Sequence, residues 1–250
     1  MYPVLLKIGN LTVYTYGTIL YLDLLLSVYL LSRFCNRFGL EFSRVFNYTI
    51  VLVFSMYIGG KLGFLIINRE EVDSLFDFMV YIIDPHSGGL TIIGSIIFSA
   101  LVLYFASFLF KFNFLALADL FSFVSPFSIF VGRLACLFAG CCYGKPSSWG
   151  VFINGTTRYP TQIIESLLSL MLFLYFLYLL KRYNQPGTFL GSFFIGYGFI
   201  RFFVEFFRES NIVMLNLSSA QIFCIMMIIV GFVLLIWIKR ADRQELGGNV

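Results

Sequence analysis

The sequence predicts an all-α integral membrane protein with about seven transmembrane helices, and three observations lead to this prediction. Of the 250 residues, 60% are hydrophobic and only 12% are charged, whereas a soluble domain carries about 25% charged residues. A helix needs roughly 20 apolar residues to cross a hydrocarbon core of about 30 Å. Seven such stretches occupy most of the chain. We therefore expect a single multi-pass membrane domain over residues 1–250.

Short polar or Gly/Pro-containing links separate the expected spans. The link 68–88 is longer and acidic, and its apolar piece 76–83 is too short to cross a membrane, so we expect that piece at the interface. The N-terminal segment lacks the basic start and apolar core of a cleaved signal peptide, which leaves targeting to the first span. The expected spans are 14–34, 47–67, 89–110, 114–140, 162–180, 188–207 and 219–238.

Basic residues outside the spans are divided unequally between the two sides of the membrane. Nine fall on the side of the C-terminus and five on the other. Because Lys and Arg are enriched in cytoplasmic loops, we expect a cytoplasmic C-terminus and an external N-terminus. The same residues are spread thinly over short loops, so we expect no nucleic-acid partner. The nine are Arg33, Arg37, Arg44, Lys111, Lys181, Arg182, Lys239, Arg240 and Arg243, and the five are Lys7, Arg69, Lys145, Arg158 and Arg208.

The five cysteines form no pattern typical of a disulfide framework. Cys141 and Cys142 are adjacent and therefore poorly placed to bond to each other. No His stands near enough in the sequence to suggest a metal site, so we expect no metal and no cofactor. We interpret the two adjacent cysteines as small residues that permit close helix packing, with a reactive thiol as the alternative.

Several ionisable residues lie inside the expected spans, where a charge costs at least about 2.5 kcal/mol. Counted from the cytoplasmic end at about 1.5 Å per residue, Lys61, Arg133 and Arg201 fall in the outer half of the membrane. Glu165 and Glu205 fall in the same half. Each residue alone is compatible with structural pairing or snorkelling. The convergence of the whole set on one leaflet favours a functional site.

The residue types at this depth indicate an anionic substrate. The guanidinium fork of Arg matches phosphate oxygens, and two arginines in a low-dielectric setting can hold a lipid headgroup and stabilise a phosphate leaving group. A lipid of the outer leaflet would reach them laterally between helices, with its acyl chains left in the bilayer. The sequence therefore predicts a phospholipid substrate.

Six segments, in order along the chain, carry a resemblance to a known family. The segments are YTYG at 14–17, GGKLG at 59–63, GGL at 88–90, VGRLACLFAG at 131–140 followed by YG at 143–144, RYPTQ at 158–162 with Glu165, and GYGFIRFFVEFFR at 196–208. In these segments the chain resembles the bacterial prolipoprotein diacylglyceryl transferases, and the resemblance covers most of its length. A single Gly-Arg or Tyr-Gly pair would be a weak signal, whereas six segments in the right order with seven spans are specific.

The resemblance implies transfer of the diacylglyceryl group of phosphatidylglycerol to the lipobox cysteine thiol of exported prolipoproteins. A thioether would form and glycerol phosphate would be released. The family also implies a multi-pass protein of the bacterial inner (plasma) membrane that works at the outer leaflet, and we expect a monomer. A divergent relative that uses the same donor lipid on another acceptor is the alternative.

The resemblance implies roles for nine residues. Arg133 and Arg201 would bind the phosphate, and Glu205 would orient an arginine or assist proton movement. Tyr16 would line the headgroup pocket. The implied catalytic residues are Arg133, Arg201 and Glu205, and the implied substrate-binding residues are Arg133, Tyr16, Lys61, Arg158, Gly144, and Gln162 and Glu165 in support.

The chain departs from the family pattern at several positions, which leaves the proton acceptor open. The only His in the chain is His86, and we interpret it as a structural or solvated residue of the link before the third span. The substituted positions are Cys136 and Ala139, where Asn is usual, Cys141, where Glu is usual, Lys61, where Arg is usual, and Ile93, where the family has His.

Two other classes of protein share the expected topology. A seven-helix receptor or retinal protein fits an external N-terminus, but retinal binding requires a lysine in the last span, and 219–238 contains none. An ion or solute transporter would need polar residues through the inner half of the membrane, where Asp119 stands alone. Both classes are therefore less favoured than a lipid-modifying transferase.

Overall fold

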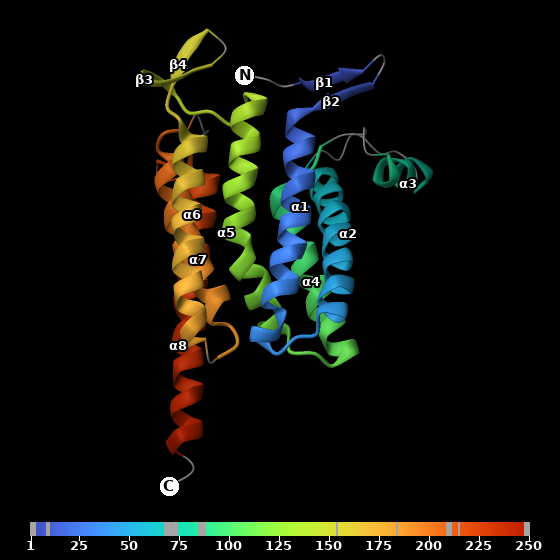
Figure 1. Cartoon of the computed structure of the whole chain (residues 1–250), viewed down its shortest axis with the longest axis vertical. Coiled ribbons are helices and arrows are strands. Elements are labelled where there is room, and N and C mark those ends of the chain that lie inside the picture. The colour runs from blue at the N-terminus through green and yellow to red at the C-terminus, as the bar shows by residue number, and fades with distance from the viewer. Residues whose placement is uncertain are drawn as a thin grey trace. The chain divides into compact units, whose positions relative to one another are not determined.

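The computed structural model describes residues 4–8, 11–67, 75–84, 89–153, 155–183, 185–208, 212–214 and 216–247. Seven helices in this part of the chain are long and apolar enough to cross a membrane (Figure 1). The prediction of an all-α membrane protein with about seven spans is thus confirmed. The seven are α1 (Thr15–Phe34), α2 (Phe42–Ile67), α4 (Ile92–Phe110), α5 (Phe114–Ala139), α6 (Thr161–Leu179), α7 (Thr188–Glu205) and α8 (Ser219–Gly247).

Most helix bounds lie within a few residues of the expected ones. The exceptions are the beginning of α2, which is five residues earlier than expected, and the end of α8, which runs beyond residue 238. Short 3-10 turns follow α1 (Cys35–Phe38) and α6 (Leu180–Arg182). The chain divides into two compact units, Met1–Phe38 with Leu115–Val250, and Gly39–Phe114.

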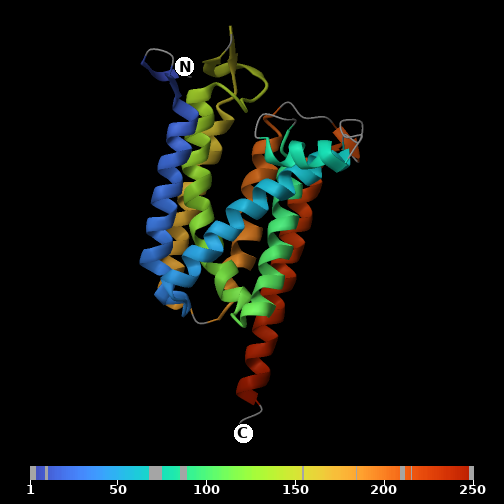
Figure 2. The same ribbon diagram turned by 90° about the vertical axis from the view of Figure 1, so that its right-hand side faces the viewer.

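The first unit contains α1, α5, α6, α7 and α8. Because α5, α6, α7 and α8 follow one another and alternate in direction, α5 and α7 end where α6 and α8 begin (Figures 1 and 2). We call this end of the unit the hairpin end, because three short antiparallel hairpins lie there, one before α1 and two in the links before α6 and α8. They are β1 (Val4–Ile8) with β2 (Leu11–Tyr14), β3 (Pro146–Ile153) with β4 (Thr156–Arg158), and β5 (Ile212–Met214) with β6 (Leu217–Ser218).

Aromatic rings pack the opposite end of the first unit. The buried ring of Phe123 on α5 lies 4.9 Å from the ring of Phe34 and 5.9 Å from that of Phe38, measured between centroids. Phe173 of α6 and Phe189 of α7 lie 5.6 and 5.5 Å from it. Helices in lipid associate through close van der Waals packing of this kind. The cluster therefore fixes α1, α5, α6 and α7 against one another.

Asp119, the acidic residue expected near the inner face, has a structural role. Its carboxylate is fully buried and accepts hydrogen bonds from the backbone N–H groups of Gly187, at 2.7 Å, and Leu190, at 2.8 Å. The first N–H groups of a helix have no partner within the helix, and a negative charge is favoured there. Asp119 thus caps the N-terminus of α7, which removes the one residue that suggested a transport path.

The second unit contains α2, α4 and the nine-residue helix α3 (Leu75–Ile83). A Cβ added to Gly59 would lie 2.6 Å from the carbonyl oxygen of Gly94, and one added to Gly63 would lie 2.9 Å from its Cα. The glycines of segment 59–63 therefore let α2 and α4 approach closely, as small residues do in membranes. At about 14 Å, α3 is too short to cross a bilayer.

Candidate active site

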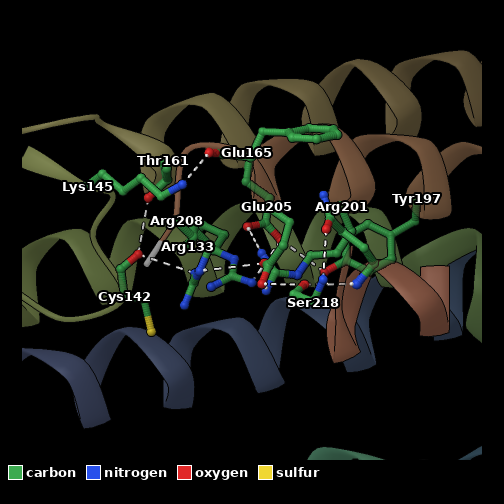
Figure 3. Close-up of polar contacts among 12 residues, drawn as sticks. Arg133, Cys142, Lys145, Thr161, Glu165, Tyr197, Arg201, Glu205, Arg208 and Ser218 are labelled. Atoms are coloured by element: carbon green, nitrogen blue, oxygen red, sulfur yellow. Dashed lines mark hydrogen bonds and ion pairs between the residues drawn. The ribbon is translucent and has the colours of Figure 1, made fainter. Parts of the chain in front are cut away.

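The carboxylate of Glu165, in the first turns of α6, joins three helices. Oε1 accepts a hydrogen bond from Arg133 Nη2 of α5 at 2.8 Å and another from Tyr197 Oη of α7 at 3.0 Å (Figure 3). Oε2 lies 3.6 Å from Arg201 Nη1, also on α7. Glu165 is fully buried, and a buried carboxylate is stable only when it is paired and hydrogen-bonded. Glu165 therefore holds the two arginines side by side.

Glu205, one turn beyond Arg201 on α7, forms a second centre. Its Oε2 lies 2.8 Å from Arg201 Nη2 and 3.9 Å from Arg208 Nε, while Oε1 accepts a hydrogen bond from Ser218 Oγ at 3.2 Å. The spacing of four residues makes the first pair sterically easy on one helix face. Ser218 in turn contacts Gln221 at the start of α8. Arg201 thus bridges both carboxylates.

The cluster has an uneven distribution of charge and exposure. Among the residues that the structure describes, three guanidinium groups face two carboxylates, which leaves an excess of positive charge. The side chains of Arg133 and Arg201 are each 18% exposed and that of Arg208 is 20% exposed, whereas those of Glu165 and Glu205 are 0% and 4% exposed. The carboxylates lie behind the guanidinium groups, whose outer N–H donors can still reach a ligand. Such a surface fits a phosphate group.

Arg208 also holds the loop that follows α5. Its Nη1 donates to the carbonyl oxygen of Cys142 at 3.3 Å, and the same oxygen accepts a hydrogen bond from Thr161 Oγ1 at 3.2 Å. Figure 3 shows this oxygen turned toward Thr161 and the sulfur of Cys142 turned away from it. Gln162 Nε2 donates to the neighbouring Cys141 carbonyl at 2.8 Å. Gln162 therefore supports the loop that follows α5.

Gly144, in the loop after α5, lies in close contact with the segment before α6 and the segment after α7. It forms an isolated β-bridge with Arg208, and its N–H donates to the carbonyl oxygen of Tyr159. A Cβ at this position would lie 2.6 Å from the carbonyl oxygen of Phe207 and 2.7 Å from the Cβ of Tyr159. A side chain cannot be accommodated there without a shift of backbone. The structure gives Gly144 a packing role, and its implied role in substrate binding stays a prediction.

Arg158, on β4, belongs to the same loop region but not to the arginine cluster. Its guanidinium lies 4.4 Å from the centroid of the Tyr143 ring, and Nη1 donates to the carbonyl oxygen of Gly144 at 3.3 Å. The cation–π contact and the hydrogen bond hold the hairpin against the loop 140–144.

Tyr16, in the first turn of α1, lines an open pocket of about 500 Å³ together with residues of the loop after α5. Tyr14 and Gly17 complete the α1 side, and Ala139 and Cys141 form the other side. The lining is mostly apolar, which suits a lipid or an apolar peptide segment.

Lys61 belongs to the second unit. It is fully buried, its Nζ donates to the carbonyl oxygen of Asp84 at 3.0 Å, and it lies 4.6 Å from the centroid of the Tyr81 ring. Ile93, where the family has His, is exposed on α4. His86 lies outside the described residues. The implied role of Lys61 in substrate binding stays a prediction.

Three cysteine sulfurs meet where α5 passes into the loop that follows it, an arrangement that the sequence does not predict. The Sγ atoms of Cys136, Cys141 and Cys142 all lie within 4.8 Å of one another. A hydrogen bond from the Cys136 thiol and the guanidinium of Arg208 lower the pKa of the Cys142 thiol, against the effect of burial. Burial and the neighbouring Cys142 raise the pKa of the Cys141 thiol.

The structure brings together four of the implied site residues, Arg133, Glu165, Arg201 and Glu205. Sequence reasoning gave no role to Tyr197 or Ser218. Tyr197 could have been found, because it stands four residues before Arg201 and therefore on the same helix face. Ser218 had no such signal, since its contact depends on how the link before α8 folds.

Comparison with known proteins identifies the family. The sequence model of prolipoprotein diacylglyceryl transferase matches residues 3–237. The chain belongs to this family. Three of the six segments that resemble the prolipoprotein diacylglyceryl transferases, 131–144, 158–165 and 196–208, supply the cluster around Glu165 and Glu205 and the loop bonded to it.

Named relatives match the chain along nearly its whole length. A Clostridium perfringens phosphatidylglycerol–prolipoprotein diacylglyceryl transferase 2 is 32% identical over 98% of this chain and 98% of its own length. A Chlorobaculum tepidum phosphatidylglycerol–prolipoprotein diacylglyceryl transferase is 30% identical over 100% of this chain and 95% of its own. One from Clostridium tetani is 29% identical over 97% and 98%.

Proposed function

We propose that this protein transfers the diacylglyceryl group of phosphatidylglycerol to the lipobox cysteine thiol of exported prolipoproteins, at the outer leaflet of the bacterial plasma membrane. The observation that carries the proposal is the arrangement of Arg133, Arg201 and Arg208 in front of two buried carboxylates. Family membership and the names of the relatives support the same reaction.

The arginines bind the phosphodiester of the donor lipid. Arg133 and Arg201 donate to its oxygens, and the acceptor sulfur attacks the glyceryl carbon that carries the phosphate. A carbon–sulfur bond forms as the carbon–oxygen bond breaks, and the electron pair leaves with glycerol phosphate. The thiol proton passes to water or to the departing phosphate. The guanidinium groups stabilise the charge that develops on the leaving group, in a site largely shielded from water.

The two carboxylates position the arginines. Because Glu165 binds Arg133 and Arg201 together, the two guanidinium groups are fixed before the lipid arrives. Such preorganisation removes the cost of ordering the side chains during the reaction. Glu205 holds Arg201 from the opposite side.

The orientation belongs to the proposal. The hairpin end of the first unit faces outward, with the N-terminus external and the C-terminus cytoplasmic, because the excess of basic residues lies on the side of the C-terminus. The arginines then reach lipids of the outer leaflet and the exported acceptor. The capping role of Asp119 disfavours a transporter.

The test is release of glycerol phosphate by the purified full chain. Labelled phosphatidylglycerol is supplied with a lipobox peptide, and with the same peptide carrying Ser in place of Cys as the control. We expect glycerol phosphate and a thioether-linked diacylglyceryl peptide with the Cys peptide only. Release that is independent of the peptide thiol would support the alternative of another acceptor, and absence of release would contradict a transferase.

A further inference from the structure

We propose that Cys136, Cys141 and Cys142 bind one thiophilic divalent ion of the zinc type, and that the open fourth position of this ion takes and activates the acceptor cysteine thiol. The second part rests on the transferase function proposed above. It departs from the expectation, based on the sequence, of packing cysteines and no metal.

The three sulfurs lie close enough together to share one metal ion. Zn²⁺ binds thiolate sulfur at about 2.3 Å, which places the sulfurs of a tetrahedral site about 3.8 Å apart. The three Sγ atoms here lie within 4.8 Å of one another. Small rotations of the Cys side chains would bring the sulfurs from this separation to that of a tetrahedral zinc site. Packing alone does not require three thiols to converge from a helix and a loop.

The backbone of the loop that carries two of the cysteines is held in an uncommon conformation. Gly140 ends α5 with a φ of 73°, and Cys142 adopts a φ of 60°, a left-handed conformation rare for a residue with a side chain. Hydrogen bonds to Thr161 and Arg208 fix the Cys142 carbonyl, and Gln162 fixes that of Cys141. Such conformations persist where the surroundings impose them, often at ligand-binding sites. Here they turn two thiols back toward Cys136.

Two arginines beside the cysteine cluster supply the positive charge that a thiolate-bound metal needs. Three thiolates on a divalent cation carry one net negative charge, which needs a positive neighbour in a low-dielectric region. Arg208 binds the Cys142 carbonyl, and Arg133 stands one helical turn before Cys136 on α5. The positive excess of the arginine cluster therefore suits a negatively charged metal site beside it.

The cysteine cluster is accessible from a pocket. Cys141 lines the open pocket of about 500 Å³ next to Tyr16. Among the described residues the cluster offers three cysteine ligands. Three protein ligands with one open position are typical of catalytic zinc, whereas structural zinc is closed by four. The pocket can admit an acceptor thiol to the open position.

The chemistry that follows fits a thiol acceptor. The acceptor thiol gives its proton to water when it coordinates, because a metal-bound thiol is deprotonated. The resulting thiolate attacks the glyceryl carbon, the carbon–sulfur bond forms, and the carbon–oxygen bond to phosphate breaks. The electron pair leaves with glycerol phosphate, whose charge the arginines receive. No oxidant or reductant takes part.

Metal binding is tested without reference to activity. The purified, reduced full chain is titrated with Co²⁺, which takes tetrahedral thiolate sites and shows thiolate-to-metal charge-transfer absorbance. We expect one Co²⁺ per chain, with affinity lowered about tenfold or more by each of Cys136→Ser, Cys141→Ser and Cys142→Ser. The matched control is Cys35→Ser, whose buried thiol bonds the Ser32 carbonyl at the opposite end of α1, and it should bind as the wild type does.

Two results would overturn the metal site. One is the absence of the charge-transfer band in the folded wild type. The other is an unchanged band in the triple serine variant. Should a serine variant fail to fold, maleimide labelling of the wild type in membranes replaces it, with Cd²⁺ expected to protect all three thiols. Labelling that Cd²⁺ leaves unchanged contradicts the site, as does a disulfide among the three that persists under reducing conditions.

Activation of the acceptor has its own test. A lipobox peptide added to the Co²⁺-loaded protein should shift the charge-transfer spectrum, whereas the peptide with Ser in place of Cys should not. Equal spectra with both peptides would overturn coordination of the acceptor thiol. Glycerol phosphate release by a metal-free triple serine variant at the wild-type rate would overturn activation and leave the transferase proposal standing. A thiol-dependent spectral shift without any release would instead overturn the transferase proposal.

Discussion

Arg133 and Glu165 meet at 2.8 Å across α5 and α6, and the carboxylate of that pair is fully buried. An ion pair in this setting has two consequences. It orders a guanidinium group that has donors left for a ligand, and it makes each partner depend on the other. The first consequence governs activity and the second governs stability.

Arg133→Lys and Arg201→Lys are each expected to lose most of the transfer activity, and the alanine variants all of it. Lysine keeps the positive charge but lacks the planar fork that binds two phosphate oxygens at once. The folded state should persist in detergent, because Glu165 keeps Tyr197 and one arginine. The measurement is glycerol phosphate release from labelled phosphatidylglycerol. Wild-type turnover in either alanine variant would show that the arginines do not bind the phosphate.

A double-mutant cycle on Arg133→Ala and Glu165→Ala is expected to show strong coupling in the free energy of unfolding. Loss of one partner weakens the pairing of the other, and the cost stays below the roughly 3–5 kcal/mol of a fully buried pair, because Arg133 is 18% exposed and Glu165 keeps Tyr197 and Arg201. The double variant should therefore be more stable than the sum of the single effects implies. Unfolding in detergent is the measurement. The matched control is the exposed pair of Arg44 and Glu41, 3.1 Å apart, for which no measurable coupling is expected. Additive effects at Arg133 and Glu165 would contradict the pairing.

A reporter fused after the C-terminus is expected to behave as a cytoplasmic one. The physical reason is the excess of basic residues on that side, which the insertion machinery retains in the cytoplasm. A reporter that is active only outside the cytoplasm should stay silent there and give a signal when fused at the N-terminus. The opposite pair of results would reverse the proposed orientation and turn the arginine cluster inward.

Gly144→Ala is expected to destabilise the protein by about 1–3 kcal/mol, because its Cβ would meet backbone and side-chain atoms at less than 3 Å. The matched control is Gly132→Ala in α5, where a Cβ would find no atom within 4 Å. That change should preserve or raise stability, since Ala is the better helix former. Thermal unfolding of the two variants gives the comparison. Equal stability would show that the close approach of Gly144 to Tyr159 and Phe207 is not tight in solution.

Much of the fold and part of the candidate site follow from the sequence. Long apolar stretches have one stable arrangement in a bilayer, so the spans were predictable. The depth of a charge in a span follows from its position in the helix, which is why Arg133, Arg201 and Glu205 were found. Roles that depend on the fold of the links were not accessible. The short hairpins have too few residues to show a periodic pattern.

The thiol cluster shows the same limit most clearly. Cys136 stands several residues before Cys141 and Cys142 in the sequence. An α-helix that continued through all three positions would keep their side chains apart. The left-handed turn at Gly140 reverses the chain and brings the sulfurs together. Glycine adopts positive and negative φ about equally readily, so the value at Gly140 depends on tertiary contacts that a single sequence does not determine.

The cap that Asp119 forms on α7 sets the register of that helix. Leu190, bonded to Asp119, and Arg201, bonded to Glu165, stand about 17 Å apart along the axis of α7. A helix is nearly rigid over this length, and a slip by one residue would turn Arg201 by about 100° and carry it about 1.5 Å along the axis. The Asp119 carboxylate at one end of α7 thereby determines the direction and height of the Arg201 guanidinium at the other end.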